Sequence, residues 1–386
     1  MLLFPENVSC IDGASAWRIA CMKIMVLVIG TAAGTGQGGV STALPGYLAA
    51  LEGAGFAYKF IASHEGGSPL QKFSIYLHAL AELVGSISET KSKRQTPVVY
   101  VHIGSWFSML RKLSFVWVGK IMGAKSVCQV HSLSMDRYLR HAVGRLACRF
   151  FFAQMDRVLV LTEWWRSRLA DVGVKRLDIV PNPLSESFER VAHQARVEGG
   201  SAGSGHPVKI LSMARLVHGK GIDLAIQSLL YLPAQYGLTI AGSGPWQNEL
   251  EAMVSSLGLS ERVVFLGWVK GESRSALFET HDVFLLPSQN DSFGMGFIEA
   301  MAHGLPVVAL NRGAIADVVA GGRAGFLIGQ PDAVLLADAL WRLAASDLRA
   351  KMGKYGKQWV LRKFSIASVS LKLSRMMSLL LNEENR

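Results

Sequence analysis

The stretch 287-PSQNDSFGMGFIEAMAHGLPVVA-309 sets an apolar helical pattern between two short apolar runs. Asp291 follows the first run, Phe293 and Gly294 stand where the helix is expected to begin, and Glu299 falls inside it. The neighbours of Glu299 are almost all apolar, so we expect its carboxylate to be buried. A helix beginning just after a strand also offers free backbone N–H groups to an anion. The stretch therefore predicts a strand–loop–helix–strand unit with a ligand site at the carboxyl end of its first strand.

The same alternation of short apolar runs and helical patterns extends along the whole chain. In the first half the runs lie near residues 23–30, 57–62, 98–103, 126–131 and 157–162. In the second half they read VKILSMA, GLTIAG, RVVFLG, DVFLLP, LPVVAL and AGFLI. This pattern is typical of parallel sheets covered by helices on both faces. We predict an α/β protein with two Rossmann-like parallel-sheet domains that face each other across a cleft.

The chain of 386 residues is long enough for two domains, and one segment is suited to join them. VEGGSAGSGHP, residues 197–207, is rich in Gly and Ser and has no hydrophobic period, which predicts a linker. We expect residues 22–196 to form the N-terminal domain and residues 208–364 the C-terminal domain. Residues 365–386 are expected to form a helix that packs back on the first domain, and residues 1–21 an extension or a misassigned start.

Cysteine use and hydropathy bear on where the protein works. The four cysteines at positions 10, 21, 128 and 148 form no C-x-x-C motif, which suits a reducing compartment. No uninterrupted apolar run reaches the roughly 18 residues of a membrane span, and no basic segment precedes an apolar one at the N-terminus. We expect a cytoplasmic location.

The net charge of +11 is concentrated in one segment. Residues 91–176 hold 16 Lys and Arg against four Asp and Glu, so the rest of the chain is close to neutral. A solvated basic face, an anionic membrane surface and nucleic acid are three readings of such a segment. Trp106, Phe107 and Trp117 lie among these basic residues, a mixture that favours the headgroup region of a membrane. No nucleic-acid-binding motif is present, so we expect peripheral binding to a membrane and no nucleic acid.

A glycine-rich turn follows the first apolar run. Gly34, Gly36 and Gly39 satisfy G-x-G-x-x-G, but residues 31–33 separate the run from the first glycine, unlike a dinucleotide fingerprint. Val40-Ser41 follows the last glycine where a phosphate-binding Walker loop needs Lys and Ser or Thr. The turn leads into a helix, so it suits either an anion or close packing alone.

The stretch 287–309, together with MARLVHGKG at residues 213–221, resembles the retaining glycosyltransferases of the GT-B fold, family 4, also described as glycosyl transferases group 1. The resemblance runs from about Lys23 to Phe364. The E-x7-E signature of that family is matched in spacing by Asp291 and Glu299. Asp291 replaces the first glutamate, which keeps the charge and shortens the reach by one methylene.

A nucleotide-sugar donor leaves as a diphosphate, whose developing charge must be stabilised. The chain has no D-x-D to hold a metal, and we expect no metal and no cofactor. Arg215 and Lys220, just after an apolar run, can supply positive charge instead. The resemblance implies that Glu299 accepts hydrogen bonds from the ribose and that Asp291 contacts the donor sugar.

The resemblance also places a strand-end histidine opposite the donor sugar. His131 fits this position and His102, at the preceding strand end, is the competitor. Gly267 to Val269 resembles the stretch beside the base. The predicted catalytic residues are His131, Arg215, Lys220 and Asp291, and the predicted donor-binding residues are Gly38, Gly39, Gly242, Gly244, Phe293, Gly294, Met295 and Glu299.

The activity implied by the resemblance is transfer of a sugar from a UDP- or GDP-linked donor, with retention of configuration. The acceptor would be a saccharide or a polyprenyl-diphosphate-linked saccharide of bacterial surface polysaccharide or glycolipid assembly. We expect the enzyme on the cytoplasmic face of the inner membrane. Two alternatives are a nucleotide-sugar epimerase of the same fold and a non-catalytic nucleotide-sugar-binding partner.

Overall fold

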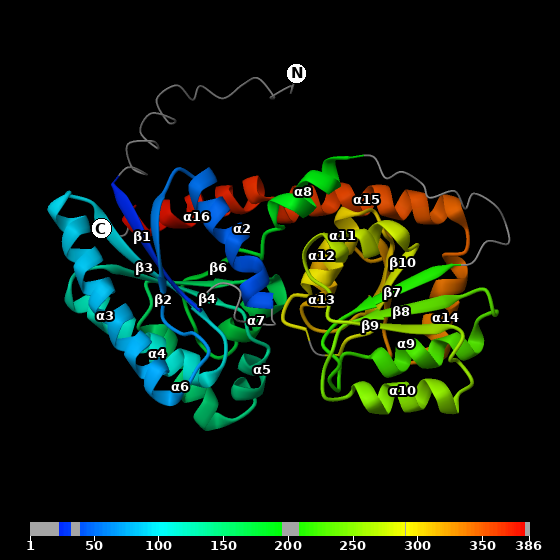
Figure 1. The fold of residues 1–386 in the computed structure, drawn as a ribbon. Helices are drawn as coiled ribbons and strands as arrows, with labels where there is room; N and C mark the ends of the chain where they lie inside the picture. Colours follow the sequence, from blue (N-terminus) through cyan, green and yellow to red (C-terminus); the bar gives the residue numbers. More distant parts are fainter. Residues whose placement is uncertain (1–22, 32–38, 195–207, 290, 383–386) are drawn as a thin grey trace, which may run out of the picture.

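The computed structural model describes residues 23–31, 39–194, 208–289 and 291–382. The predicted extension, the predicted linker and Gly38 lie outside the described residues. Two parallel sheets, each flanked by helices on both faces, make up the fold (Figure 1). The predicted fold class, α/β with two parallel-sheet domains, is confirmed. The predicted domain boundaries stay predictions.

The first sheet has the strand order β2-β1-β3-β4-β5-β6, and every pair is parallel. The register sets Val28 of β1 between Phe60 of β2 and Tyr100 of β3. The central strands are buried on both faces, which explains their continuous apolar runs. The strands are β1 Ile24–Gly30, β2 Ala57–Ala62, β3 Thr96–Ile103, β4 Lys125–Val130, β5 Arg157–Val160 and β6 Leu177–Ile179.

The second sheet is also wholly parallel, in the order β12-β11-β10-β7-β8-β9. Its strand order reverses at β7 and β10, so a ligand is expected near the carboxyl ends of these two strands. The strands are β7 Lys209–Met213, β8 Gly237–Ala241, β9 Val263–Gly267, β10 Val283–Leu286, β11 Val307–Leu310 and β12 Gly325–Ile328.

Helices cover both faces of each sheet because parallel strands need crossover connections. On the first sheet α2 and α16 lie on one face, and α3, α4 and α6 lie on the other (Figure 1). The helices of the first half are α2 Gly39–Gly53, α3 Pro69–Ser92, α4 Trp106–Ile121, α5 Ser134–Leu139, α6 Ala142–Ala153, α7 Glu163–Ala170 and α8 Glu186–His193. Those of the second half are α9 Ile222–Ser228, α10 Gln247–Ser256, α11 Gly271–Thr280, α12 Met295–Ala302, α13 Ile315–Val318, α14 Ala333–Arg342, α15 Ser346–Phe364 and α16 Ile366–Asn382.

The chain returns to the first domain through α15 and α16, which meet at Ser365. Together they form the helical stretch Ser346–Leu381, which, within the described ranges, is alone in being long and apolar enough to cross a membrane by length and composition. This candidate span was not predicted from the sequence, because polar and charged residues interrupt its apolar runs. In the structure α15 packs against α12 of the second domain and α16 packs against α2 of the first.

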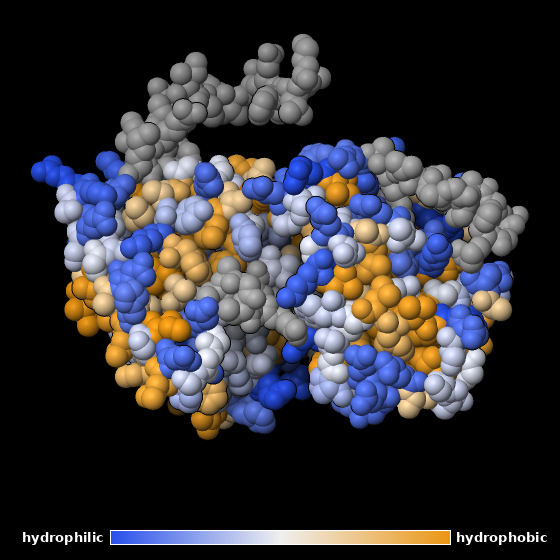
Figure 2. All heavy atoms as spheres, in the orientation of Figure 1, coloured by the Kyte–Doolittle hydropathy of each residue, from blue (hydrophilic) through white to orange (hydrophobic). Residues whose placement is uncertain are grey.

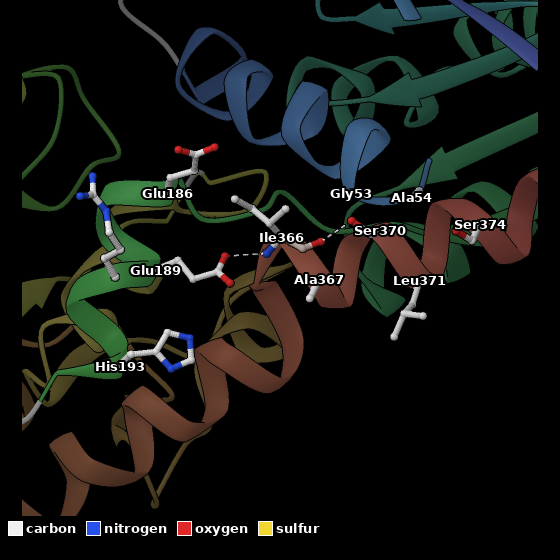
Figure 3. A pocket seen from close by; sticks show the side chains of 11 residues that line it. Gly53, Ala54, Glu186, Glu189, His193, Ile366, Ala367, Ser370, Leu371 and Ser374 are labelled. Atoms are coloured by element: carbon white, nitrogen blue, oxygen red, sulfur yellow. Dashed lines mark hydrogen bonds between the residues drawn. The ribbon is translucent and has the colours of Figure 1, made fainter. Parts of the chain in front are cut away.

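The return point is held by hydrogen bonds between distant segments. A carboxylate oxygen of Glu189 accepts the backbone N–H of Ile366 at 2.7 Å, and the Ser370 hydroxyl donates to the Ala50 carbonyl at 2.8 Å. Figure 3 shows Glu189, Ile366 and Ser370 around a groove of about 780 Å³ between α2, α8 and α16. Glu189 therefore acts as a cap for α16, because the first N–H groups of a helix have no partner within it.

Replacing Glu189 tests this cap. Glu189→Ala is expected to lower the free energy of unfolding by about 1 kcal/mol, the usual cost of losing a helix cap. Glu186→Ala is the matched control: it removes the same charge from an exposed position on α8, so it should cost less than about 0.5 kcal/mol. Urea unfolding of both variants measures the difference, and equal losses would mean that the contact to Ile366 adds no stability.

Candidate active site

A cavity of about 510 Å³ lies where the carboxyl ends of the two sheets meet, with walls from both domains. Strand ends supply its lining because parallel strands direct their following loops to one edge of the sheet. The predicted residues His131, Arg215, Lys220, Gly242, Asp291, Phe293, Gly294 and Met295 all line it. Other lining residues include Thr42, Gly104, Ser132, Asn182, Trp268 and Arg274.

The second-domain wall consists of loops in close backbone contact. A Cβ on Gly242 would lie 1.8 Å from the Ala214 carbonyl oxygen, and one on Gly244 would lie 2.2 Å from that of Leu216. These glycines let the loops after β7 and β8 touch. Gly242 also borders the cavity, whereas Gly244 is not among its lining residues. Packing between loops accounts for Gly244, and its predicted donor contact stays a prediction.

Lys220 and Asp291 meet at the floor of the cavity. Their Nζ and Oδ1 atoms are 2.9 Å apart, and the side chains are only 17% and 16% exposed. The loops that carry them are held together by a backbone bond, Gln289 N–H to the Gly219 carbonyl at 2.9 Å. Arg215, by contrast, is exposed at the cavity wall. The ion pair thus fixes the positions of the Lys220 and Asp291 side chains, whereas the exposed Arg215 side chain is free to extend into the cavity.

The N-terminus of helix α12 lies at the cavity, so the backbone amide groups of its first turn border it. Gly294 precedes the helix with φ of +86°, a left-handed conformation that favours glycine. Phe293 is buried and packs edge-to-face against Phe364, with ring centroids 5.4 Å apart. These contacts fix the start of the helix, and its first residues, Met295 and Gly296, line the cavity, where backbone N–H groups can bind an anion.

Glu299 lies one turn further along α12 and is 1% exposed. Arg274 from α11 donates to its Oε2 through Nε at 3.1 Å and also through Nη2. Both residues line a second hollow of about 870 Å³, which shares Thr42, Trp268, Val269 and Arg274 with the first. Arg274 was not predicted from the sequence, because nothing in a pattern shows that residues 25 positions apart will meet.

The first-domain wall contains a buried histidine pair rather than one histidine. Nδ1 of His102 and Nε2 of His131 are 2.8 Å apart, and the rings stack at 15°. Burial, together with the charge of Lys112, lowers the pKa of His131 to about 3, and burial lowers that of His102 as well. The Lys112 ammonium is buried against the His102 carbonyl, and burial lowers its pKa to about 7. His131 is therefore uncharged at physiological pH, so it would meet a ligand as a neutral imidazole, and its predicted catalytic role stays a prediction.

Two tryptophans of α7 donate hydrogen bonds to two separate segments of the second domain. The Trp165 indole N–H donates to the Ser292 carbonyl at 2.8 Å, next to Asp291 and Phe293. The backbone N–H of Trp164 donates to Asp317 at 2.7 Å. No local pattern predicts these two contacts, since adjacent tryptophans near a helix start are equally expected in a core.

Three buried polar atoms around the cavity have no hydrogen-bond partner within the described residues. They are Nδ1 of His131, Nε1 of Trp268 and Oδ2 of Asp291. Buried polar atoms are nearly always paired, so these three indicate a polar ligand that would satisfy them. Over the same residues no three His, Cys, Asp or Glu side chains gather to hold a metal ion. Gly39 is the first residue of α2, and its predicted donor contact stays a prediction.

Two facing parallel-sheet domains with a polar cleft define the GT-B class of fold. Solved structures confirm the fold: sucrose-phosphate synthase from Thermosynechococcus elongatus has a TM-score of 0.70, 20% identity, and covers 93% of this chain and 99% of its own. HepE from Anabaena, in complex with UDP and glucose, has a TM-score of 0.68 at 16% identity, over 92% and 99%.

Sequence comparison narrows the class for the second half of the chain. Residues 201–359 match the family described as Glycosyl transferases group 1. The putative colanic acid biosynthesis glycosyltransferase WcaL of Salmonella typhimurium is 29% identical over 51% of this chain and 49% of its own length. The amylovoran biosynthesis glycosyltransferase AmsK of Erwinia amylovora is 27% identical over 68% and 64%. The chain thus spans about half to two thirds of the length of these relatives.

The pKa of His131 predicts how stability changes with pH. An unfolded histidine titrates near pH 6.5, so between that pH and about 3 the unfolded chain binds a proton that the folded chain does not. Stability should fall as pH falls through this window, by up to about 1.4 kcal/mol per pH unit. His131→Asn should remove that contribution, whereas His141→Asn, at an exposed position, should not.

Urea unfolding at about pH 6 and about pH 4.5 gives the change in the free energy of unfolding per pH unit for wild type and for each variant. A His131→Asn slope equal to that of wild type would mean that His131 is not held neutral in the folded state.

Proposed function

We propose that this chain is a glycosyltransferase that moves a sugar from a nucleotide-sugar donor to a saccharide acceptor with retention of configuration. The observation that carries the proposal is one cavity, walled by both domains, around which basic, acidic and amide groups converge and three buried polar atoms stay unpaired. A nucleotide sugar has the matching chemistry, a diphosphate anion joined to two hydroxyl-rich rings.

The residues divide into a diphosphate side and a sugar side. Lys220, Arg215 and the amide groups of Gly294 and Met295 would contact the diphosphate, because they line the cavity and can donate hydrogen bonds to an anion. Arg274 also lines the cavity, but it is paired with Glu299. Oδ2 of Asp291 would accept from a sugar hydroxyl, and neutral His131 would bond the sugar from the opposite domain. Glu299, held by Arg274, would accept from the ribose.

In the proposed reaction the acceptor oxygen attacks the anomeric carbon on the face from which the diphosphate leaves. The bond from that carbon to the phosphate oxygen breaks, the new bond to the acceptor oxygen forms, and the acceptor proton passes to the departing phosphate. The protein contributes position and a preorganised positive environment. This route needs no metal, because Arg215 and Lys220 take the charge of the leaving group.

Relatives support an acceptor in surface polysaccharide or glycolipid assembly. Besides WcaL and AmsK, a GDP-mannose-dependent alpha-(1-6)-phosphatidylinositol monomannoside mannosyltransferase of Mycolicibacterium smegmatis is 29% identical over 61% of this chain and 65% of its own. We propose a saccharide or lipid-linked saccharide acceptor, a UDP- or GDP-linked donor, and a site of action on the cytoplasmic face of the inner membrane.

The test begins with a thermal-shift screen of UDP- and GDP-sugars, since specific binding raises the melting temperature. The stabilising donor is then incubated with saccharide acceptors in excess chelator, and proton NMR reads the anomeric configuration of the product. Transfer with retention supports the proposal. An inverted product, or transfer that needs added magnesium or manganese, contradicts the mechanism. Free epimerised nucleotide sugar would identify an epimerase, and binding without any reaction a non-catalytic partner.

The diphosphate contacts make a quantitative prediction. Arg215→Ala and Lys220→Ala should each lower turnover about 100-fold at saturating donor, or about 3 kcal/mol, as when a preorganised donor to a developing anion is removed. Arg215→Lys should also fail, because it keeps the charge and loses the planar fork. Glu299→Ala should weaken donor binding more than turnover.

Lys354→Ala removes an exposed charge from α15 and is the matched control. Turnover near the wild-type value in both Arg215→Ala and Lys220→Ala would mean that another group stabilises the leaving diphosphate.

A further inference from the structure

One face of the first domain exposes an unusual number of large apolar side chains. Of the twenty exposed large apolar residues within the described ranges, eleven lie on α3, α4 and α6. Figure 2 shows apolar residues gathered over the part of the molecule where Figure 1 draws these helices. They are Leu70, Phe73, Leu77, Val84, Phe107, Leu110, Trp117, Ile121, Val143, Leu146 and Phe150, which we name the α3–α4–α6 face.

On each helix these residues follow the helical period, so they form stripes. On α4 Phe107 and Ile121 are 81% and 86% exposed, and Leu110 and Trp117 between them complete one side of the helix. The other side of α4 is buried against the sheet. Tyr76 of α3 donates to Ser114 of α4 at 2.8 Å, so the two helices are neighbours and their stripes join.

The exposed charges on α4 and α6 are all basic, and the two glutamates of α3, Glu82 and Glu89, pair with Lys59 and Lys93. The sequences of α4 and α6 contain no Asp or Glu, while Lys120, Arg145 and Arg149 are exposed on them. Only part of the basic segment predicted from the sequence, residues 91–176, therefore adds positive charge to this face. Arg140 and Arg168 pair with Asp136, and Lys112 is buried, so these residues do not add free charge to the surface.

We infer that the α3–α4–α6 face inserts its apolar side chains into an anionic lipid surface, with the basic residues at the level of the headgroups. Apolar stripes edged by Lys and Arg have this chemistry, with aromatic rings and long basic side chains at the polar boundary. A second copy of the chain fits less well, because an isologous contact would set the same basic residues against each other. The inference goes beyond the proposed function and stands whether or not the cleft transfers a sugar.

The inserted and the charged residues should respond differently to salt. Raising salt from about 0.1 M to 1 M shortens the screening length from about 10 Å to about 3 Å, which weakens attraction by the basic residues. Apolar burial is not screened in this way. Binding to vesicles that contain phosphatidylglycerol should therefore weaken with salt and still keep a remainder at 1 M.

The experiment is sedimentation of the full chain with vesicles of phosphatidylcholine, with and without phosphatidylglycerol. Phe107→Ser with Ile121→Ser should weaken binding at least about tenfold at both salt concentrations, since two large apolar side chains would no longer be buried in the lipid. Val334→Ser with Leu335→Ser, on exposed positions of α14, is the matched control and should leave binding unchanged. Lys120→Glu with Arg149→Glu should abolish the preference for phosphatidylglycerol.

Two results would overturn the inference. One is equal vesicle binding by wild type and the α4 double variant. The other is a wild-type dimer that ignores vesicles and that the α4 double variant converts to a monomer, which would assign the face to a second copy. Melting curves of each variant confirm that the chain is folded, so neither result can come from misfolding.

Discussion

The second domain depends on loops that touch backbone to backbone at the carboxyl ends of β7, β8 and β10. A Cβ on Gly221 would lie 2.1 Å from the Pro287 carbonyl oxygen, and Gly242 and Gly244 make equally close contacts with the loop after β7. Without these glycines the loops would have to separate. Their contact brings Lys220 and Asp291, 71 positions apart in the sequence, to within 2.9 Å. The shape of this wall of the cavity is thus set by contacts between backbone segments, and the side chains that line it are carried on those segments.

The first domain completes the site from the opposite side. Its contribution is largely uncharged: the His102 and His131 rings are buried and neutral, and Tyr47 packs edge-on against both. The second domain contributes the charges. This division suits a ligand whose anion is bound by one domain and whose polar ring is contacted by the other. Trp165 links the two halves, because its indole holds the carbonyl of Ser292 in the loop that carries Asp291.

The sequence predicts the fold well because parallel strands buried on both faces leave continuous apolar runs. β6 was missed, since Leu177–Ile179 has only three residues and Asp178 interrupts its apolar character. Along α12 the burial of Glu299 was expected from its apolar neighbours and is observed. Arg274 was missed because its contact with Glu299 depends on how α11 packs on α12, which no local pattern records. The burial of Lys112 could not be predicted, since a lysine on a basic helix gives no sign of burial.

The central claim is that the cavity recognises a diphosphate through Lys220 and the amide groups at the start of α12. The most direct measurement is calorimetric titration of the protein with a nucleoside diphosphate and with the matching monophosphate. The account predicts that the diphosphate binds at least about tenfold tighter, the minimum expected for one added charge-assisted hydrogen bond, and that Lys220→Ala removes most of this difference. Equal affinities for the two nucleotides in the wild-type protein would contradict it.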